Sequence, residues 1–254
     1  MEKRIDLNCD MGESFGAYTI GADKELMEHI TSANIACGAH AGDPNVMDRT
    51  VSLAKEYGVG VGAHPGFPDI EGFGRRMIDF SADEIYRMVV HQIGSLQAFC
   101  AVHDVPMQHV KPHGALYNFA AKNWEAADAV ARAVRDVNPD LILFGLAGSE
   151  LLAAGRNAGL KVASEVFADR TYQPDGSLTP RGQDNALIER TEDAVEQVKQ
   201  MVNDGQVRAV NGEMIDIMAD TICVHGDGPH AAEFAEKLRA MLEEDGVEVC
   251  SVGE

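Results

Sequence analysis

The chain has 254 residues, of which 45% are hydrophobic and 24% are charged, and its formal net charge is −20. This length suits one β/α-barrel domain, and the composition is ordinary for a globular protein. The negative charge argues against nucleic-acid binding, which needs a basic surface. No apolar run reaches the roughly 18 residues that a membrane span requires. We expect one domain over residues 1–254, with neither nucleic acid nor membrane as a partner.

The N-terminus favours a cytoplasmic protein, and the cysteines indicate no special framework. Residues 1–4 lead directly into a predicted strand, without the apolar segment of a signal peptide. The five cysteines form no CxxC pair and are odd in number, so they predict neither a disulfide framework nor a zinc ribbon. Those in or beside strands are most simply small buried hydrophobic residues.

Predicted strands and helices alternate along the whole chain. Short apolar runs predict strands at residues 4–9, 32–37, 59–64, 107–112, 141–145, 161–167 and 221–225. Helical patterns fall near residues 22–30, 44–57, 81–103, 123–136, 149–157, 191–203 and 229–245. Asp43-Pro44 and the capping box from Ser81 to Glu84 mark two of the helix starts. Seven alternations predict a parallel sheet wrapped by helices, the pattern of a β/α barrel.

Two segments interrupt this alternation. Residues 65–80 are rich in glycine, proline and arginine and predict a long loop after the third strand. Residues 205–218 predict a small β-hairpin that turns at Asn211-Gly212, before the last strand. We therefore expect one barrel with a hairpin insertion.

Alternation within the strands predicts a polar barrel interior. In the first strand, one face carries Asp6, Asn8 and Asp10, and the other carries Ile5, Leu7 and Cys9. The same rule groups His109, Lys111 and His113 in the fourth strand, and Thr221, Cys223, His225 and Asp227 in the seventh. Gly60 and Gly62 lie in register with His64 and would leave space there. Each unpaired buried polar group costs about 1–3 kcal/mol, so this face requires a hydrogen-bonded network, a metal or a substrate.

Several strands end in potentially reactive residues, and in β/α barrels the active site forms at these ends. Asp10, His40 and His64 follow three neighbouring strands and could hold a divalent metal ion. They could equally form a metal-free hydrogen-bond network that contacts a substrate. No HExxH or other short metal motif decides between these interpretations.

The fourth and sixth strands end in a second group of candidates. Lys111 could neutralise a carboxylate or an oxyanion, and His113 could transfer protons near neutral pH. Asp169 and Arg170 follow a later strand. The alternative is an ion pair between Asp169 and Lys111 that only closes the barrel mouth.

Two loops carry further candidates. Glu13, in the loop Asp10–Gly16, is a plausible general base, although acidic residues near a helix start also serve as caps. The loop after His64 is either a lid that brings Arg75 and Arg76 to an anion or an ordinary surface loop. The sequence has no P-loop and no GxGxxG between a strand and a helix, so ATP would have to bind differently or on a partner.

Long segments resemble the LamB/YcsF family, which is associated with the A subunit of bacterial 5-oxoprolinase. They are residues 6–16, 32–44, 62–65, 110–117, 167–172 and 222–227, so the resemblance covers nearly the whole chain. It implies a seven-stranded barrel of the glycoside hydrolase/deacetylase type. It also implies the ATP-dependent opening of 5-oxoproline to L-glutamate, with partner subunits B and C.

This reaction assigns roles to the residues at the strand ends. The expected catalytic residues are Asp10, Glu13, His40, His64, Lys111, His113 and Asp169. The expected substrate contacts are Asn8, Arg75, Arg170, Arg181, His225 and Asp227. A metal-dependent amidase or deacetylase that acts without ATP is an alternative, and a non-catalytic metabolite-binding regulator is another.

Overall fold

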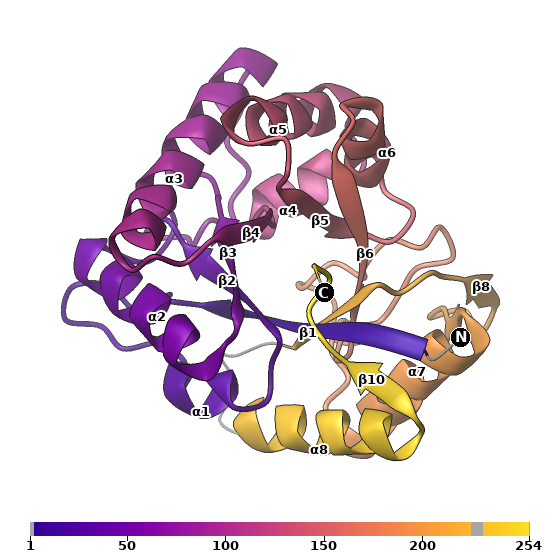
Figure 1. The fold of residues 1–254 in the computed structure, drawn as a ribbon. Coiled ribbons are helices and arrows are strands. Elements are labelled where there is room, and N and C mark those ends of the chain that lie inside the picture. Colours follow the sequence, from indigo (N-terminus) through magenta and orange to yellow (C-terminus); the bar gives the residue numbers. More distant parts are fainter. Residues whose placement is uncertain (1–2, 225–230, 254) are drawn as a thin grey trace.

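Seven parallel strands close into a barrel in the computed structural model, which describes residues 3–224 and 231–253 (Figure 1). The strands are β1 (Lys3–Met11), β2 (Ser32–Ala36), β3 (Gly60–His64), β4 (Met107–Val110), β5 (Ile142–Leu146), β6 (Lys161–Phe167) and β9 (Thr221–Val224). Each strand pairs with its neighbour in this order, and β9 also pairs with β1, which closes the ring. The predicted β/α barrel of seven strands is confirmed.

Helices surround this ring on the outside (Figure 1). They are α1 (Asp23–Met27), α2 (Pro44–Tyr57), α3 (Ala82–Val102), α4 (Gly114–Ala120), α5 (Trp124–Val137), α6 (Glu150–Asn157), α7 (Thr191–Asp204) and α8 (Ala231–Glu244). Within residues 3–224 and 231–253, no helix is both long and apolar enough to cross a membrane.

Local signals in the sequence explain where several helices begin and end. The Asp43 side chain accepts hydrogen bonds from the backbone N–H groups of Asn45 and Val46 at the start of α2. Ser81 and Glu84 form the predicted capping box at the start of α3. Gly58 ends α2 in the left-handed conformation, at φ 69°.

The hairpin prediction is confirmed, and two elements were not predicted. Strands β7 (Gln206–Arg208) and β8 (Met214–Asp216) pair in antiparallel fashion. The short helix α4 was missed because its seven residues are too few to show a helical period. Strand β10 (Val247–Val249) was also missed; its three residues pair in parallel with the first residues of β1.

The barrel interior follows the predicted alternation. Ile5, Leu7 and Cys9 of β1 are buried in the hydrophobic core. Asp6 lies on the opposite face, where it accepts hydrogen bonds from Ser32, Thr31 and Thr221. Asn8 donates to Glu165 and Thr221. The polar groups of the strands therefore pair with one another across the barrel.

The space predicted beside the two glycines of β3 is filled. A side chain at Gly62 would overlap the imidazole of His109, and one at Gly60 would meet the Gln108 amide. The His109 ring stacks on Phe144, with 4.2 Å between the ring centroids. These glycines make room for buried side chains of β4 rather than for a ligand.

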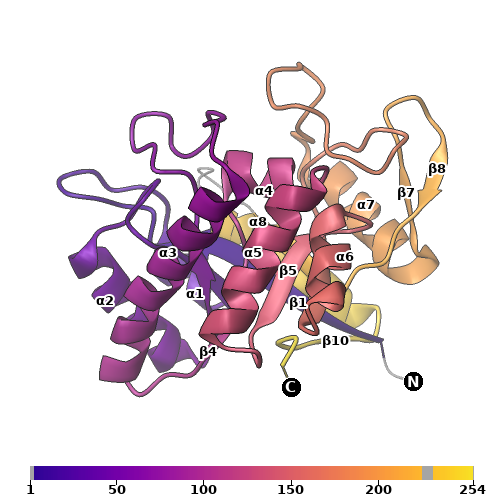
Figure 2. The ribbon, with the colours of Figure 1, turned by 90° about the horizontal axis from the view of Figure 1, so that it is seen from above.

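The two ends of the barrel differ in what closes them. Both termini lie at the same end, opposite the long loops that follow the strands (Figure 2). At the terminal end, Val252 packs against Ile142, Phe144 and Ala163 of the interior. The Gln108 side chain donates to Ser251. The C-terminal segment thus plugs one end, and the loops at the other end surround the candidate site.

Candidate active site

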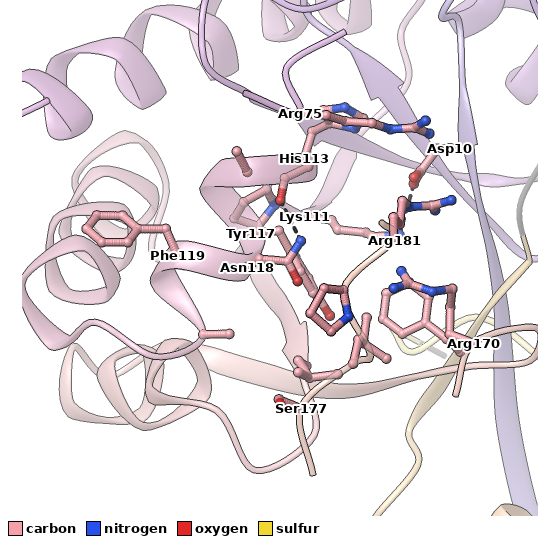
Figure 3. A pocket seen from close by; sticks show the side chains of 18 of the residues that line it. Asp10, Arg75, Lys111, His113, Tyr117, Asn118, Phe119, Arg170, Ser177 and Arg181 are labelled. Carbon is pink, nitrogen blue, oxygen red and sulfur yellow. Dashed lines mark hydrogen bonds and ion pairs between the residues drawn. The ribbon is translucent and has the colours of Figure 1, made fainter. Parts of the chain in front are cut away.

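A cavity of about 540 Å³ opens at the C-terminal ends of the strands. Its wall includes Asp10, near the end of β1, and His64, at the end of β3. Lys111 and His113, directly after β4, also contribute (Figure 3). These four residues, which we predicted from separate strand ends, therefore line one common space, as expected for a β/α barrel.

A buried ammonium group forms the inner part of this cavity. Lys111 Nζ lies 2.9 Å from an Asp10 oxygen and 2.8 Å from a Glu165 oxygen. Burial alone would lower the pKa of Lys111, but the Asp10 and Glu165 carboxylates hold it well above its usual value. Burial would likewise raise the pKa of Asp10, but His64 and Lys111 hold it well below the usual range. Both groups are therefore charged at neutral pH.

Glu165 is a site residue that the sequence analysis missed. It lies on β6 and is fully buried, and its oxygens accept hydrogen bonds from Asn8 at 3.0 Å and from the Tyr117 hydroxyl at 2.6 Å. Alternation along β6 could have placed its side chain inside the barrel. However, Ala163 and Phe167 flank Glu165 on the same face of β6, so no continuous polar face was visible in that strand.

Two imidazoles meet beside Asp10. His64 Nδ1 lies 2.7 Å from the carbonyl oxygen of Lys111, and His113 Nε2 lies 2.8 Å from that of Phe73. Because a carbonyl oxygen only accepts, each of these nitrogens carries a hydrogen. The other two nitrogens, His64 Nε2 and His113 Nδ1, face each other at 2.9 Å. In neutral rings both present lone pairs, so the space between them suits a proton or another cation.

A third imidazole stacks behind this pair. The rings of His40 and His113 are parallel, with 3.7 Å between their centroids. His40 Nε2 lies 3.7 Å from Glu13 Oε1. Burial and the neighbouring His113 lower the pKa of His40 well below its usual value, and burial with His64 lowers the pKa of His113 to about 3. Both rings therefore favour their neutral forms.

The loop after β3 packs directly on these rings. A Cβ atom at Gly66 would lie 2.8 Å from His40 Nδ1, and one at Gly74 would lie 2.7 Å from His40 Cβ. Phe73 has a positive φ of 54°, unusual for a residue with a side chain, and its carbonyl fixes the His113 ring. The loop is thus a fitted wall of the site rather than a loose surface segment.

Arginines border the outer part of the cavity (Figure 3). Arg75, Arg170 and Arg181 line it, whereas the exposed Arg76 pairs with Asp69. Arg170 is buried and donates to the carbonyl oxygens of Thr179 and Ala186. Burial and the nearby Arg181 lower the pKa of Arg170 to about 10, so it stays charged at neutral pH.

Some predicted residues lie away from the cavity. Asn8 lies beneath Lys111, whose Nζ is 3.1 Å from its side-chain oxygen, and does not line the cavity. Asp169 precedes Arg170 but is likewise absent from the wall. The predicted substrate contacts His225 and Asp227 lie outside the described residues.

The sequence model of the LamB/YcsF family matches residues 5–254. This chain belongs to the LamB/YcsF family. A relative from Halalkalibacterium halodurans, named as the A subunit of 5-oxoprolinase, is 61% identical over 252 residues, which cover 99% of this chain and 98% of the relative. A protein of the same name from Bacillus subtilis is 58% identical over 251 residues, which cover 99% and 98% of the two chains.

Solved structures share the fold of this chain. The crystal structure of a lactam utilization protein from Thermus thermophilus superimposes with a TM-score of 0.92 at 45% identity, covering 97% of this chain and 99% of that one. A putative cellobiose-phosphate cleavage protein from Enterococcus faecalis gives a TM-score of 0.59 at 13% identity, over 100% and 98% of the chains. The second likeness extends to the fold alone.

Proposed function

We propose that this chain is the A subunit of an ATP-hydrolysing 5-oxoprolinase, which opens 5-oxoproline to L-glutamate together with subunits B and C. The names of its relatives support this assignment. The observation that carries it is the buried Lys111 ammonium, held between Asp10 and Glu165 beside the imidazoles that line the same cavity. We place the reaction in the cytoplasm, where ATP is available.

The chemistry explains why ATP is needed. A lactam carbonyl is a poor electrophile because amide resonance must be broken before water can attack. Transfer of the γ-phosphoryl group of ATP to this oxygen converts it into a good leaving group and releases ADP. One water then opens the ring by breaking the C–N bond, and a second releases phosphate from the resulting acyl phosphate. The products are glutamate, ADP and phosphate.

The inner cavity can supply the charges that this reaction requires. Lys111 would bind the developing negative charge on the carbonyl oxygen, because a preorganised cation stabilises such charge strongly. Asp10 and Glu13 would position and deprotonate the attacking water. Asp10 Oδ2 lies 3.3 Å from His64 Nε2, so the His64–His113 pair could take up that proton and return it to the leaving nitrogen. His40 would act by holding the His113 ring in place.

The outer cavity suits an anion larger than the lactam. Arg75, Arg170 and Arg181 would bind the substrate carboxylate and the phosphoryl group, for which guanidinium groups have matching geometry. Asn8 would hold the Lys111 ammonium in position by accepting its hydrogen bond. Asp169 would help to position its neighbour Arg170. We retain His225 and Asp227 as predicted substrate contacts. ATP would be bound by or with the partner subunits.

The test is 5-oxoproline-dependent ATP hydrolysis and glutamate release by the complex reconstituted from this chain and subunits B and C. The changes Lys111→Ala and His64→Ala should each lower kcat by about 10²–10⁴-fold, the range for loss of a charge-stabilising or proton-transfer group. His91→Ala, at an exposed position of α3, is the control and should retain full activity. Near-normal activity of either site variant would remove that residue from the mechanism.

A metal-dependent amidase or deacetylase that acts without ATP is the second candidate function. The cluster of Glu13, His40, His64 and His113, whose potential ligand atoms all lie within 4.8 Å of one another, favours it. The two functions differ in one measurement. Glutamate release by the purified chain alone, without ATP and without partner subunits, would support the amidase and contradict the ATP-coupled reaction.

A further inference from the structure

We propose that Glu13, His40, His64 and His113 bind one divalent transition-metal ion of the zinc type at the inner end of the cavity. The inference concerns metal binding by this chain; an ion bound there would occupy the His64 and His113 nitrogens, so the proton transfer proposed above would then fall to Asp10. It rests on the placement of four ligand atoms, on the unsatisfied nitrogens of His40 and on the orientation of the other two rings.

The four ligand atoms already converge on one point. They lie within 4.8 Å of one another, and all four residues are buried. Glu13 Oε1 is 3.7 Å from His40 Nε2 and 3.8 Å from His113 Nδ1. Tetrahedral ligands with bonds of about 2.0–2.1 Å lie roughly 3.3 Å apart. The two Glu13 distances would have to shorten by about 0.5 Å, and the most separated pair of ligand atoms by up to about 1.5 Å, to complete the coordination.

His40 supplies independent support. It is fully buried, yet neither of its ring nitrogens has a hydrogen-bond partner among the described residues. A buried polar atom without a partner costs about 1–3 kcal/mol, so native proteins rarely leave one unexplained. Coordination of an ion by Nε2, on the side of Glu13, would satisfy one of the two nitrogens.

The other two histidines are oriented as metal ligands usually are. A ligating histidine generally donates its second N–H to a carbonyl or carboxylate, which fixes the ring and its tautomer. His64 donates to the carbonyl of Lys111, and His113 donates to that of Phe73. Their free lone pairs then point to the same place, where they lie 2.9 Å apart. A cation at this point removes the repulsion between them.

The donor set indicates the class of ion. Three imidazoles and one carboxylate suit Zn²⁺ or Co²⁺, whereas Mg²⁺ and Ca²⁺ prefer oxygen ligands. Asp10, which we expected in the metal set from the sequence, lies 3.3 Å from His64 Nε2 but also accepts hydrogen bonds from Lys111 and Asn34. The geometry assigns its place to Glu13 and His113. Because Glu13, His64 and His113 line the cavity, a bound ion would be accessible to a substrate.

The experiment uses the full chain, stripped with a chelator and titrated with Zn²⁺ or Co²⁺. We expect one ion per chain by elemental analysis, and a visible Co²⁺ spectrum with the intensity of four- or five-coordinate sites. His40→Gln should weaken binding at least about 100-fold, more than the loss of an outer-shell partner does. Two controls should bind as the unchanged chain does: the exposed His91→Gln and the buried His109→Gln, which lies outside the cluster.

Circular dichroism identifies any variant that fails to fold. If His40→Gln does not fold, Glu13→Gln serves as the test variant in its place. The absence of stoichiometric binding by the unchanged, folded chain would overturn the inference. Equal affinity of the folded His40→Gln and the unchanged chain would do the same. Metal binding by the chain, without lactam turnover by the complex reconstituted with subunits B and C, would support the inference while contradicting the proposed function. Full turnover by the reconstituted complex, together with no metal binding by the folded chain, would contradict the inference alone.

Discussion

The two ends of the barrel interior contain similar residue types but use them differently. At the end plugged by the C-terminal segment, Asp6 accepts hydrogen bonds from three hydroxyl groups, and His109 is held between Asn34 and Phe144. At the open end, Lys111 and the imidazoles face a cavity, and His40 lacks hydrogen-bond partners among the described residues. A carboxylate or an imidazole inside this barrel is therefore not by itself a sign of catalysis.

The network at the plugged end is therefore structural, whereas the groups at the open end are available to bind a ligand. Fully paired buried groups specify which strands are neighbours and leave no capacity for a ligand. Groups whose partners are incomplete retain lone pairs and charge for binding. The distinction can be tested by substitutions at both ends.

The largest effect on stability is expected at Lys111. Lys111→Met leaves the Asp10 and Glu165 carboxylates buried without their cation, which should lower the free energy of unfolding by about 3–5 kcal/mol. Urea denaturation measures this change. Lys122→Met is the control, because this lysine also lines the cavity but is 63% exposed, and its loss should cost less than about 1 kcal/mol. An equal loss of unfolding free energy in the two variants would contradict the burial of the Lys111 ion pairs.

The next effect is a pH dependence from the plugged end. Burial raises the pKa of Asp6 to about 6. The hydrogen bond from Ser32 lowers this pKa, but burial has the larger effect. A raised pKa in the folded state stabilises the fold below about pH 4, and this contribution is lost as pH rises through about 6. The loss amounts to about 3 kcal/mol.

Asp6→Asn should therefore gain about 3 kcal/mol of stability relative to the unchanged chain between about pH 4 and pH 7. Urea denaturation of both proteins across this range isolates the contribution of Asp6, because other carboxylates titrate equally in the two. A constant difference between the two proteins would mean that the Asp6 pKa is not raised on folding.

A smaller effect tests the packing around His109. Gly62→Ala should destabilise the protein by about 1–3 kcal/mol, because the new methyl group overlaps an imidazole that is stacked on Phe144. Thermal unfolding measures the change. Gly94→Ala in α3 is matched, since nothing lies within 4 Å of its new methyl group, and it should stabilise the helix by about 0.5–1 kcal/mol. A neutral Gly62→Ala would refute the close fit of β3 and β4.

The smallest effect distinguishes two adjacent arginines. Arg75→Ala removes a cation from the cavity wall and should raise KM for 5-oxoproline about tenfold, equivalent to about 1.4 kcal/mol of binding. Arg76→Ala removes only the exposed partner of Asp69, so KM should stay within about twofold. Steady-state kinetics of the reconstituted complex provide both values. The same change of KM in both variants would indicate an effect of overall charge rather than a direct contact between Arg75 and the substrate.

The sequence alone determined the alternation of strands and helices, because apolar periodicity and helix caps are local properties. It also identified the polar faces of β1, β4 and β9, since side chains alternate along any strand. Asp10, His64, Lys111 and His113 were recognisable because each stands in a polar cluster at the end of an apolar run.

Only the tertiary structure decided which of these groups meet. Glu165 is the one carboxylate in a mainly apolar strand, and its role exists only because Asn8, Lys111 and Tyr117 approach it from other elements. The grouping of Glu13 with His40, His64 and His113, on which our proposed metal site rests, depends on differences of a few ångströms between loops. Such distances are set by barrel closure and loop packing, which bring together residues far apart in the chain and leave no local pattern in the sequence.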